Sequence, residues 1–128
     1  MSLMILSLLA QSVLPDVSEK AVQKALSKAK PVAMCQVGPD CEQRWARARE
    51  WVHENSRFTL VRDNDHEILT HFAIYANTDA SYAVALDAPL NGSRTIRFRA
   101  WCGNWIACSP KPETLTALFL HAVNSPGH

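Results

Sequence analysis

The residues of this sequence best suited to chemistry are its four cysteines, which form two equally spaced pairs. Five residues separate Cys35 from Cys41, and five separate Cys102 from Cys108. A disulfide within each pair is the simplest arrangement, although four cysteines allow three connectivities and the sequence does not choose among them. Free buried thiols and a zinc site remain open as alternatives, but paired zinc ligands usually have only about two to four residues between them. The spacing therefore favours two disulfides without a metal.

Two disulfides would place the protein in an oxidising compartment. Such bonds persist in the periplasm, the cell envelope and the extracellular space, whereas cytoplasmic thiols stay reduced. A disulfide that closes a loop of about seven residues stabilises a protein by about 2.4 kcal/mol on a chain-entropy estimate. That amount fixes the geometry of a loop more than it rescues a fold. We therefore expect a periplasmic, envelope or secreted protein that uses no cofactor.

The histidines do not form a recognisable catalytic pattern. His66 follows Asp65, but neighbouring residues of a strand point to opposite faces, so this spacing alone makes no acid–base pair. The sequence also lacks the motifs of zinc proteases, serine hydrolases and phosphate-binding loops. We therefore assign no catalytic residue. A hydrolytic enzyme with a cleft built around His66 or His71 remains an alternative.

A cationic and aromatic stretch surrounds the third cysteine and is the candidate binding surface. Arg97 and Arg99 alternate with apolar residues, and Trp101 and Trp105 stand on either side of Cys102. Tryptophan anchors many interfaces, and arginine pairs with carboxylates, so this surface suits an acidic protein or a small anionic ligand. The structural alternative is that the indoles pack against a disulfide and the arginines lie on a solvated strand face.

The composition is that of one small globular domain. Hydrophobic residues make up 48% of the chain and charged residues 20%, which is typical of folded proteins. The net charge of +1 lacks the positive excess of a general nucleic-acid binder. No apolar run reaches the roughly 20 residues that span a bilayer. We expect a single domain over residues 15–128 and no transmembrane helix.

The N-terminal residues 1–14 form an apolar segment outside that domain. They read MSLMILSLLAQSVL, and the first positive charge of the chain is Lys20, so the basic start of a standard secretory signal is missing. The segment could be a signal remnant, residues left by a tag, or a helix that covers its own domain or contacts a second copy. An apolar stretch of this length needs such a cover when it is ordered.

The hydrophobic periodicity predicts three helices and four strands. The expected helices span 17–30, about 40–55 and a segment that follows Pro112, and the expected strands span 58–62, 67–75, 82–87 and 95–102. The connections between strands are short and rich in Asn, Asp and Gly, which requires antiparallel hairpins. The sequence therefore predicts an α+β fold: a four-stranded antiparallel sheet with two N-terminal helices and one C-terminal helix packed on one face.

Several short motifs carry a resemblance to a known group of proteins. They are Cys35, Asp40-Cys41-Glu42, Trp45, Ala48, Trp51-Val52, Ser81-Tyr82, Cys102-Gly103-Asn104 and Cys108-Ser109-Pro110. With these motifs, residues 35–123 resemble small proteobacterial cell-envelope proteins and lipoproteins that have no assigned activity. The resemblance implies a compartment and no catalytic residue. The chain departs from the lipoprotein pattern because no lipobox cysteine lies near its N-terminus, which puts an envelope anchor in doubt.

Three hypotheses about function follow from the sequence. The first is a small extracytoplasmic, disulfide-stabilised binding protein of the inhibitor or immunity type, which is not an enzyme. The second is a small hydrolase with a histidine-centred cleft. The third is a structural homodimer formed through the N-terminal segment. A deep pocket with a histidine close to a carboxylate would favour the second hypothesis over the first.

Overall fold

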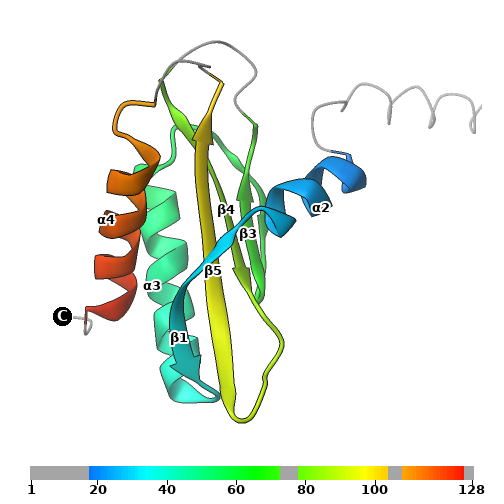
Figure 1. Cartoon of the computed structure of the whole chain (residues 1–128), viewed down its shortest axis with the longest axis vertical. Coiled ribbons are helices and arrows are strands. Elements are labelled where there is room, and N and C mark those ends of the chain that lie inside the picture. Colours follow the sequence, from blue (N-terminus) through cyan, green and yellow to red (C-terminus); the bar gives the residue numbers. More distant parts are fainter. Residues whose placement is uncertain (1–17, 73–77, 104–107, 126–128) are drawn as a thin grey trace, which may run out of the picture.

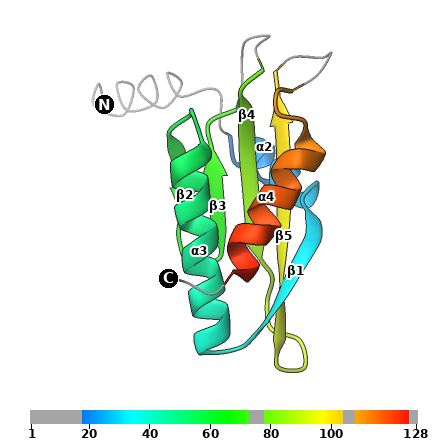
Figure 2. The ribbon, with the colours of Figure 1, turned by 90° about the vertical axis from the view of Figure 1, so that its left-hand side faces the viewer.

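A computed structural model describes residues 18–72, 78–103 and 108–125 of the chain. These residues form a five-stranded antiparallel sheet with the strand order β1-β5-β4-β3-β2 and helices on both faces (Figures 1 and 2). The elements are α2 (Glu19–Ser27), β1 (Lys30–Gln36), α3 (Pro39–Asn55), β2 (Leu60–Asp63), β3 (Glu67–Thr70), β4 (Ala80–Leu86), β5 (Ser93–Cys102) and α4 (Pro112–Asn124). The predicted α+β class and the antiparallel hairpins are confirmed.

The prediction of four strands is wrong, because β1 is a fifth strand at one edge of the sheet. It runs antiparallel to β5 and pairs Met34 with Thr95 and Gln36 with Ser93. Its second residue, Pro31, comes directly after the helix that was expected over residues 17–30. The helix ends earlier, and Pro31 lies in an edge strand, where proline's missing N–H is tolerated. The register of the pairing shifts just after this proline.

The prediction that all helices pack on one face of the sheet is also wrong. Helices α3 and α4 cover one face, and α2 covers the opposite face (Figure 2). The reason lies in β4, whose seven residues are all buried. Because side chains alternate between the faces of a strand, a strand that is apolar at every position needs a cover on both sides. Ala83 therefore packs against α2, and Val84 packs against the α3–α4 side.

The core under α3 and α4 is aromatic and large. The ring of Trp51 meets the rings of Tyr82, Phe98 and Phe119 edge-on, with centroids 5.2, 5.8 and 5.5 Å away. Phe98 and Phe119 stack with their centroids 4.2 Å apart. Edge-to-face and offset-stacked geometries are the favourable ones for aromatic rings. This cluster fixes β5 against both helices.

Both predicted disulfides are present, each within its own pair. The bond between Cys35 and Cys41 joins the end of β1 to the first turn of α3, with Cα atoms 5.0 Å apart. The bond between Cys102 and Cys108 joins the end of β5 to the chain that leads into α4, with Cα atoms 5.6 Å apart. The cysteines therefore fix how each helix leaves its strand.

Some predictions concern residues outside the described ranges. They include the apolar segment 1–14, residues 73–75 of an expected strand and Trp105. Within the described ranges, no helix has both the length and the apolar character that crossing a bilayer requires.

Candidate functional site

The predicted binding residues of β5 lie on the face that α2 covers. Arg97 is held there by α2 itself and by a neighbouring loop. Its Nε donates to Asp87 Oδ1 over 2.9 Å, and its Nη1 donates to the carbonyls of Leu26 and Ala29 at the end of α2, over 3.3 and 3.4 Å. A cation at a helix C-terminus is stabilising. Arg97 is therefore a structural residue that ties α2 to the sheet.

Arg99 lies two residues further along β5, on the same face, and has a different environment. Its guanidinium lies over the ring of Trp101, 4.2 Å from the centroid. Trp101 in turn meets Phe72 edge-on, with centroids 5.5 Å apart. Burial lowers the pKa of Arg99, because removal from water disfavours the charged form. No carboxylate among the described residues forms an ion pair with it.

Arg99 also lines a groove, which we call the edge groove. Strand β1 begins at Lys30, opposite Phe98, so the last residues of β5 pair with β4 alone. The groove lies where β1 begins beside β5, and its volume is about 650 Å³, within the range of small-molecule sites. Its lining consists of Ser27, Lys28, Lys30, Val32, Phe98, Arg99, Ala100, Pro112, Glu113 and Thr116.

The charges of the edge groove are predominantly positive. Lys28, Lys30 and Arg99 face a single acidic lining residue, Glu113. None of these three cations forms an ion pair with a carboxylate in the part of the chain that the structure describes. Lys28 at the C-cap of α2, Lys30 at the start of β1 and Arg99 on β5 therefore form a surface with an excess of positive charge. A carboxylate is the simplest group that fits.

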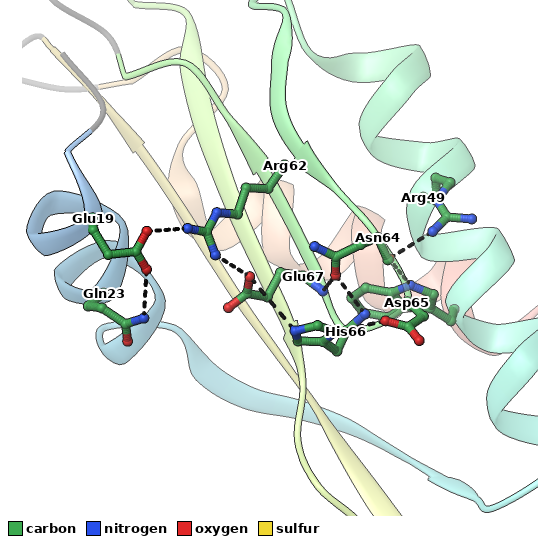
Figure 3. Close-up of polar contacts among 9 residues, drawn as sticks. Glu19, Gln23, Arg49, Arg62, Asn64, Asp65, His66 and Glu67 are labelled. Carbon is green, nitrogen blue, oxygen red and sulfur yellow. Dashed lines mark hydrogen bonds and ion pairs between the residues drawn. The ribbon is translucent and has the colours of Figure 1, made fainter. Parts of the chain in front are cut away.

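A second polar site surrounds the turn between β2 and β3 (Figure 3). The side chain of Asn64 accepts from the backbone N–H groups of His66 and Glu67, over 3.0 and 2.9 Å. The backbone carbonyl of Asn64 accepts from Trp45 Nε1 over 2.9 Å and from Arg49 Nη2 over 2.7 Å. These bonds fix the shape of the turn and hold it against α3. The turn is therefore a rigid structural element.

The same turn brings His66 and Asp65 together, which the spacing alone did not predict. His66 Nδ1 lies 2.8 Å from Asp65 Oδ1, because the two residues occupy a turn rather than a strand. The hydrogen bond with His66 lowers the pKa of Asp65. Both side chains are open to water, with 56% and 95% of their surface exposed. The pair could act as a general base, but it lies on the surface and not in a deep pocket.

Two clefts adjoin His66, and their linings bring the carboxylates of Glu42 and Glu67 near it, although Glu67 is bonded to Arg62. One cleft holds Arg49 and Arg94, whose Nε atoms donate to Asp63 and to the Asp87 carbonyl. Its cysteine, Cys41, is in a disulfide. Among the described residues, no three His, Cys, Asp or Glu side chains are placed to hold a metal ion. The backbone of the other predicted histidine, His71, is bonded to Thr59.

Sequence reasoning found Arg99 and missed its cationic neighbours. Lys28 reads as the end of a stripe with Lys20 and Lys24 on a solvated helix face. Lys30 was expected to be the last residue of that helix, but it begins β1. Only the pairing of β1 with β5 places both side chains beside Arg99, and the signal for that pairing was obscured by Pro31.

Comparisons with known proteins give no family for this chain. No protein-family model, curated protein or solved structure matches it. The similarity to small proteobacterial cell-envelope proteins therefore stays an expectation. Function has to be argued from the residues of the chain itself.

Proposed function

We propose that this chain is an extracytoplasmic binding protein that holds a carboxylate-bearing partner in the edge groove. Two local disulfides support the oxidising compartment. The resemblance to envelope proteins is consistent with the same location. A small domain that binds and blocks another protein, as inhibitors and immunity proteins do, needs one stable recognition surface and no catalytic group.

One observation carries this proposal: Arg99 is a partly desolvated cation that forms no ion pair with a carboxylate among the described residues. A desolvated charge costs free energy, and proteins usually compensate it with an opposite charge. Trp101 compensates part of it through the cation–π contact. Lys28 and Lys30 add positive charge to the same groove. A bound carboxylate would supply the negative charge with which Arg99 forms an ion pair.

The test is a calorimetric titration of the oxidised full chain with glutarate, a small dicarboxylate. Arg99→Gln should weaken binding by about tenfold or more, because a charge-assisted hydrogen bond is lost. Arg57→Gln is the matched control, since Arg57 is 78% exposed and lies outside the groove. It should bind like the wild type. Absence of binding, or an equal loss in both variants, would contradict the proposal.

The compartment has its own test. Protein isolated from its native source, alkylated without reduction, should have a mass four hydrogens below that of the reduced chain, because two disulfides form. It should carry no alkyl adduct. Four adducts after denaturation would overturn the extracytoplasmic location.

A hydrolase is the second candidate function, and the contact between His66 and Asp65 favours it. A histidine held by a carboxylate can take a proton from water. Esterase assays with activated esters would then show turnover that His66→Gln removes. The binding proposal predicts equal background rates for the wild type and this variant. A loss of turnover of about 100-fold or more, the scale of general-base catalysis, would favour the enzyme.

A further inference from the structure

Within the described residues, the last part of β5 has an open backbone edge, as the hydrogen bonds of the sheet show. Asp87 N–H donates to the carbonyl of Thr95 on β5, and Leu86 N–H donates to the carbonyl of His66, just before β3, both over 2.9 Å. Leu86, the last residue of β4, and Asp87, which follows it, thus bond to the two neighbouring strands in turn, as in any antiparallel sheet. In the β4–β5 register, the odd-numbered residues of β5 bond to β4. The N–H and C=O of Ala100 therefore point away from β4.

The side to which Ala100 points is the side of β1, but β1 does not extend that far. Val37 N–H donates to the Gly92 carbonyl over 3.0 Å, so the even-numbered residues of β5 bond toward β1. The pairing ends with Lys30 opposite Phe98. From there the chain leads back into α2, which lies over the face of the sheet (Figure 1). Among the described residues, no strand pairs with Ala100 on this side.

We infer that the partner is an extended acidic segment of another protein, which adds a short strand to β5 at Ala100. This inference rests on the proposed function and names the partner of the same groove. Strand addition to an open sheet edge is a general mode of peptide recognition, in which main-chain bonds give affinity and side-chain sites give specificity. The amide of Ala100 supplies the main-chain bonds, and the edge groove supplies the side-chain sites.

The two sides of the groove select opposite kinds of side chain. Arg99 lies on the α2 face of β5, where Trp101 packs with the α2 cluster. Phe98 and Ala100 lie on the other face and belong to the core under α3 and α4, together with Val32. Side chains of an added strand alternate between these faces. A peptide that alternates acidic and apolar residues therefore places its acids toward Arg99 and its apolar residues toward Val32.

Lysines beside an open edge also have a simpler explanation. Natural proteins place lysine at sheet edges to prevent pairing with other chains, and Lys28 and Lys30 would serve that purpose. Protection of an edge does not need a partly desolvated arginine stacked on tryptophan. The acidic partner explains Arg99 and the lysines together. The two explanations predict different results: if the lysines only protect the edge, no strand binds, whereas with an acidic partner an acidic strand binds and a neutral strand does not.

The test is calorimetric titration of the oxidised full chain with a blocked pentapeptide of alternating glutamate and valine. The controls are the same peptide N-methylated at alternate residues, in both possible sets, and a glutamine–valine version. The acidic peptide should bind at least about tenfold more tightly than the glutamine–valine version, which loses the charges. It should exceed by the same factor only one of the two N-methylated peptides, the one whose methyl groups replace the N–H groups that face β5. Equal affinity for all the peptides would overturn the inference.

Variants of the protein test the role of the main-chain bonds and of the lysine charges by changing the groove rather than the peptide. Ala100→Pro removes the outward N–H without touching the bonds to β4, since proline is tolerated on an edge strand whose N–H faces solvent. It should weaken binding of the acidic peptide about tenfold, and by more than it weakens binding of glutarate, which cannot form a strand. Lys28→Gln combined with Lys30→Gln should weaken the peptide. The matched pair Lys20→Gln with Lys24→Gln, which lie on α2 and outside the groove, should not weaken it.

The outcomes separate this inference from the proposed function. Glutarate binding that depends on Arg99, with no gain for the acidic peptide and no effect of N-methylation, leaves a carboxylate site and refutes strand addition. If neither glutarate nor any peptide binds, both proposals fail and the lysines only protect the edge. If Ala100→Pro does not fold, as judged by circular dichroism, the N-methylated peptides decide the question.

Discussion

The two faces of the sheet differ in what their packing accomplishes. Under α3 and α4 lie the large aromatic side chains, including Trp51, Phe98 and Phe119. Under α2 the buried residues are aliphatic and mostly small, namely Val22, Ala25, Leu26, Leu69, Ala83 and Ala85. Because buried apolar area dominates stability, the first face holds the fold together. The second face is covered by the single short helix α2, and Arg99 and Trp101 lie on this face of the sheet.

Polar contacts at the β2–β3 hairpin follow the same division. Arg62 points to the α2 side, where it bonds to Glu67 Oε1 over 2.6 Å and to Glu19 of α2 (Figure 3). The next residue, Asp63, points to the other side and bonds to Arg49 and His53 of α3. Alternation along the strand thus gives each helix an ion pair with the same hairpin. The two faces differ in their apolar cores and not in these polar contacts.

The largest expected effect comes from the aromatic core. Phe119→Ala removes a ring that stacks on Phe98 and meets Trp51, in a fully buried position. We expect the free energy of unfolding to fall by about 3–5 kcal/mol, measured by urea denaturation of the oxidised protein. A loss of less than about 1 kcal/mol would mean that this face does not carry the stability.

The matched change on the other face should cost less. Leu26→Ala removes a buried side chain of α2 that packs against small residues. We expect a loss of about 2 kcal/mol, at the low end for such truncations, because a short helix at the sheet surface can settle into the space. A loss equal to that of Phe119→Ala, under the same denaturation conditions, would remove the difference between the faces.

The sequence predicted the elements of the first face better than their arrangement. The apolar spacing of α3 and α4 and the alternation of β5 are local signals, and all three elements appear close to their expected bounds. Strand β1 has no such signal, because residues 30–36 show little alternation and contain Pro31. Its structure depends on pairing with residues more than fifty positions away. The face chosen by α2 depends on the same pairing.

The candidate site was predictable in the same uneven way. Arg99 and Trp101 could be found because their residue types and their position on an alternating strand suggest recognition. Lys28 and Lys30 could not, because surface lysines are common on helices and only the fold places them beside β5. The contact between His66 and Asp65 was missed because these residues lie in a turn, where the alternation rule does not apply.

A smaller effect should depend on pH. Burial acts to raise the pKa of Asp63, but the hydrogen bonds from His53 and Arg49 outweigh it, and the pKa is lowered. A carboxyl whose pKa is lower in the folded state stabilises the fold above its unfolded pKa of about 3.9, and loses this contribution as the pH falls through the folded value. At pH 7 we expect Asp63→Asn to cost about 1 kcal/mol or less.

The difference between wild type and Asp63→Asn should therefore shrink on acidification. Urea denaturation at a series of pH values from about 6 to 2 measures it. Taking the difference removes the contributions of other carboxyls, such as Asp40 and Asp65, whose pKa values are also lowered. A difference that stays constant down to the lowest pH would show that the ion pairs of Asp63 do not stabilise the hairpin.

The smallest expected effect on stability belongs to Arg99. Arg99→Gln loses the cation–π contact with Trp101 but also relieves the desolvation that lowers its pKa. These contributions oppose each other, so the free energy of unfolding should change by no more than about 0.5 kcal/mol. Thermal denaturation measures this directly. A loss of about 2 kcal/mol or more would make Arg99 a structural residue like Arg97.

One measurement tests the central claim, that recognition occurs in the edge groove, most directly. Amide chemical shifts of the oxidised full chain are followed while the pentapeptide of alternating glutamate and valine is added. We predict shift changes concentrated at residues 28–32, 98–102 and 112–116, which line or adjoin the groove. Changes centred on the turn at residues 64–67, or spread evenly over the surface, would contradict the account.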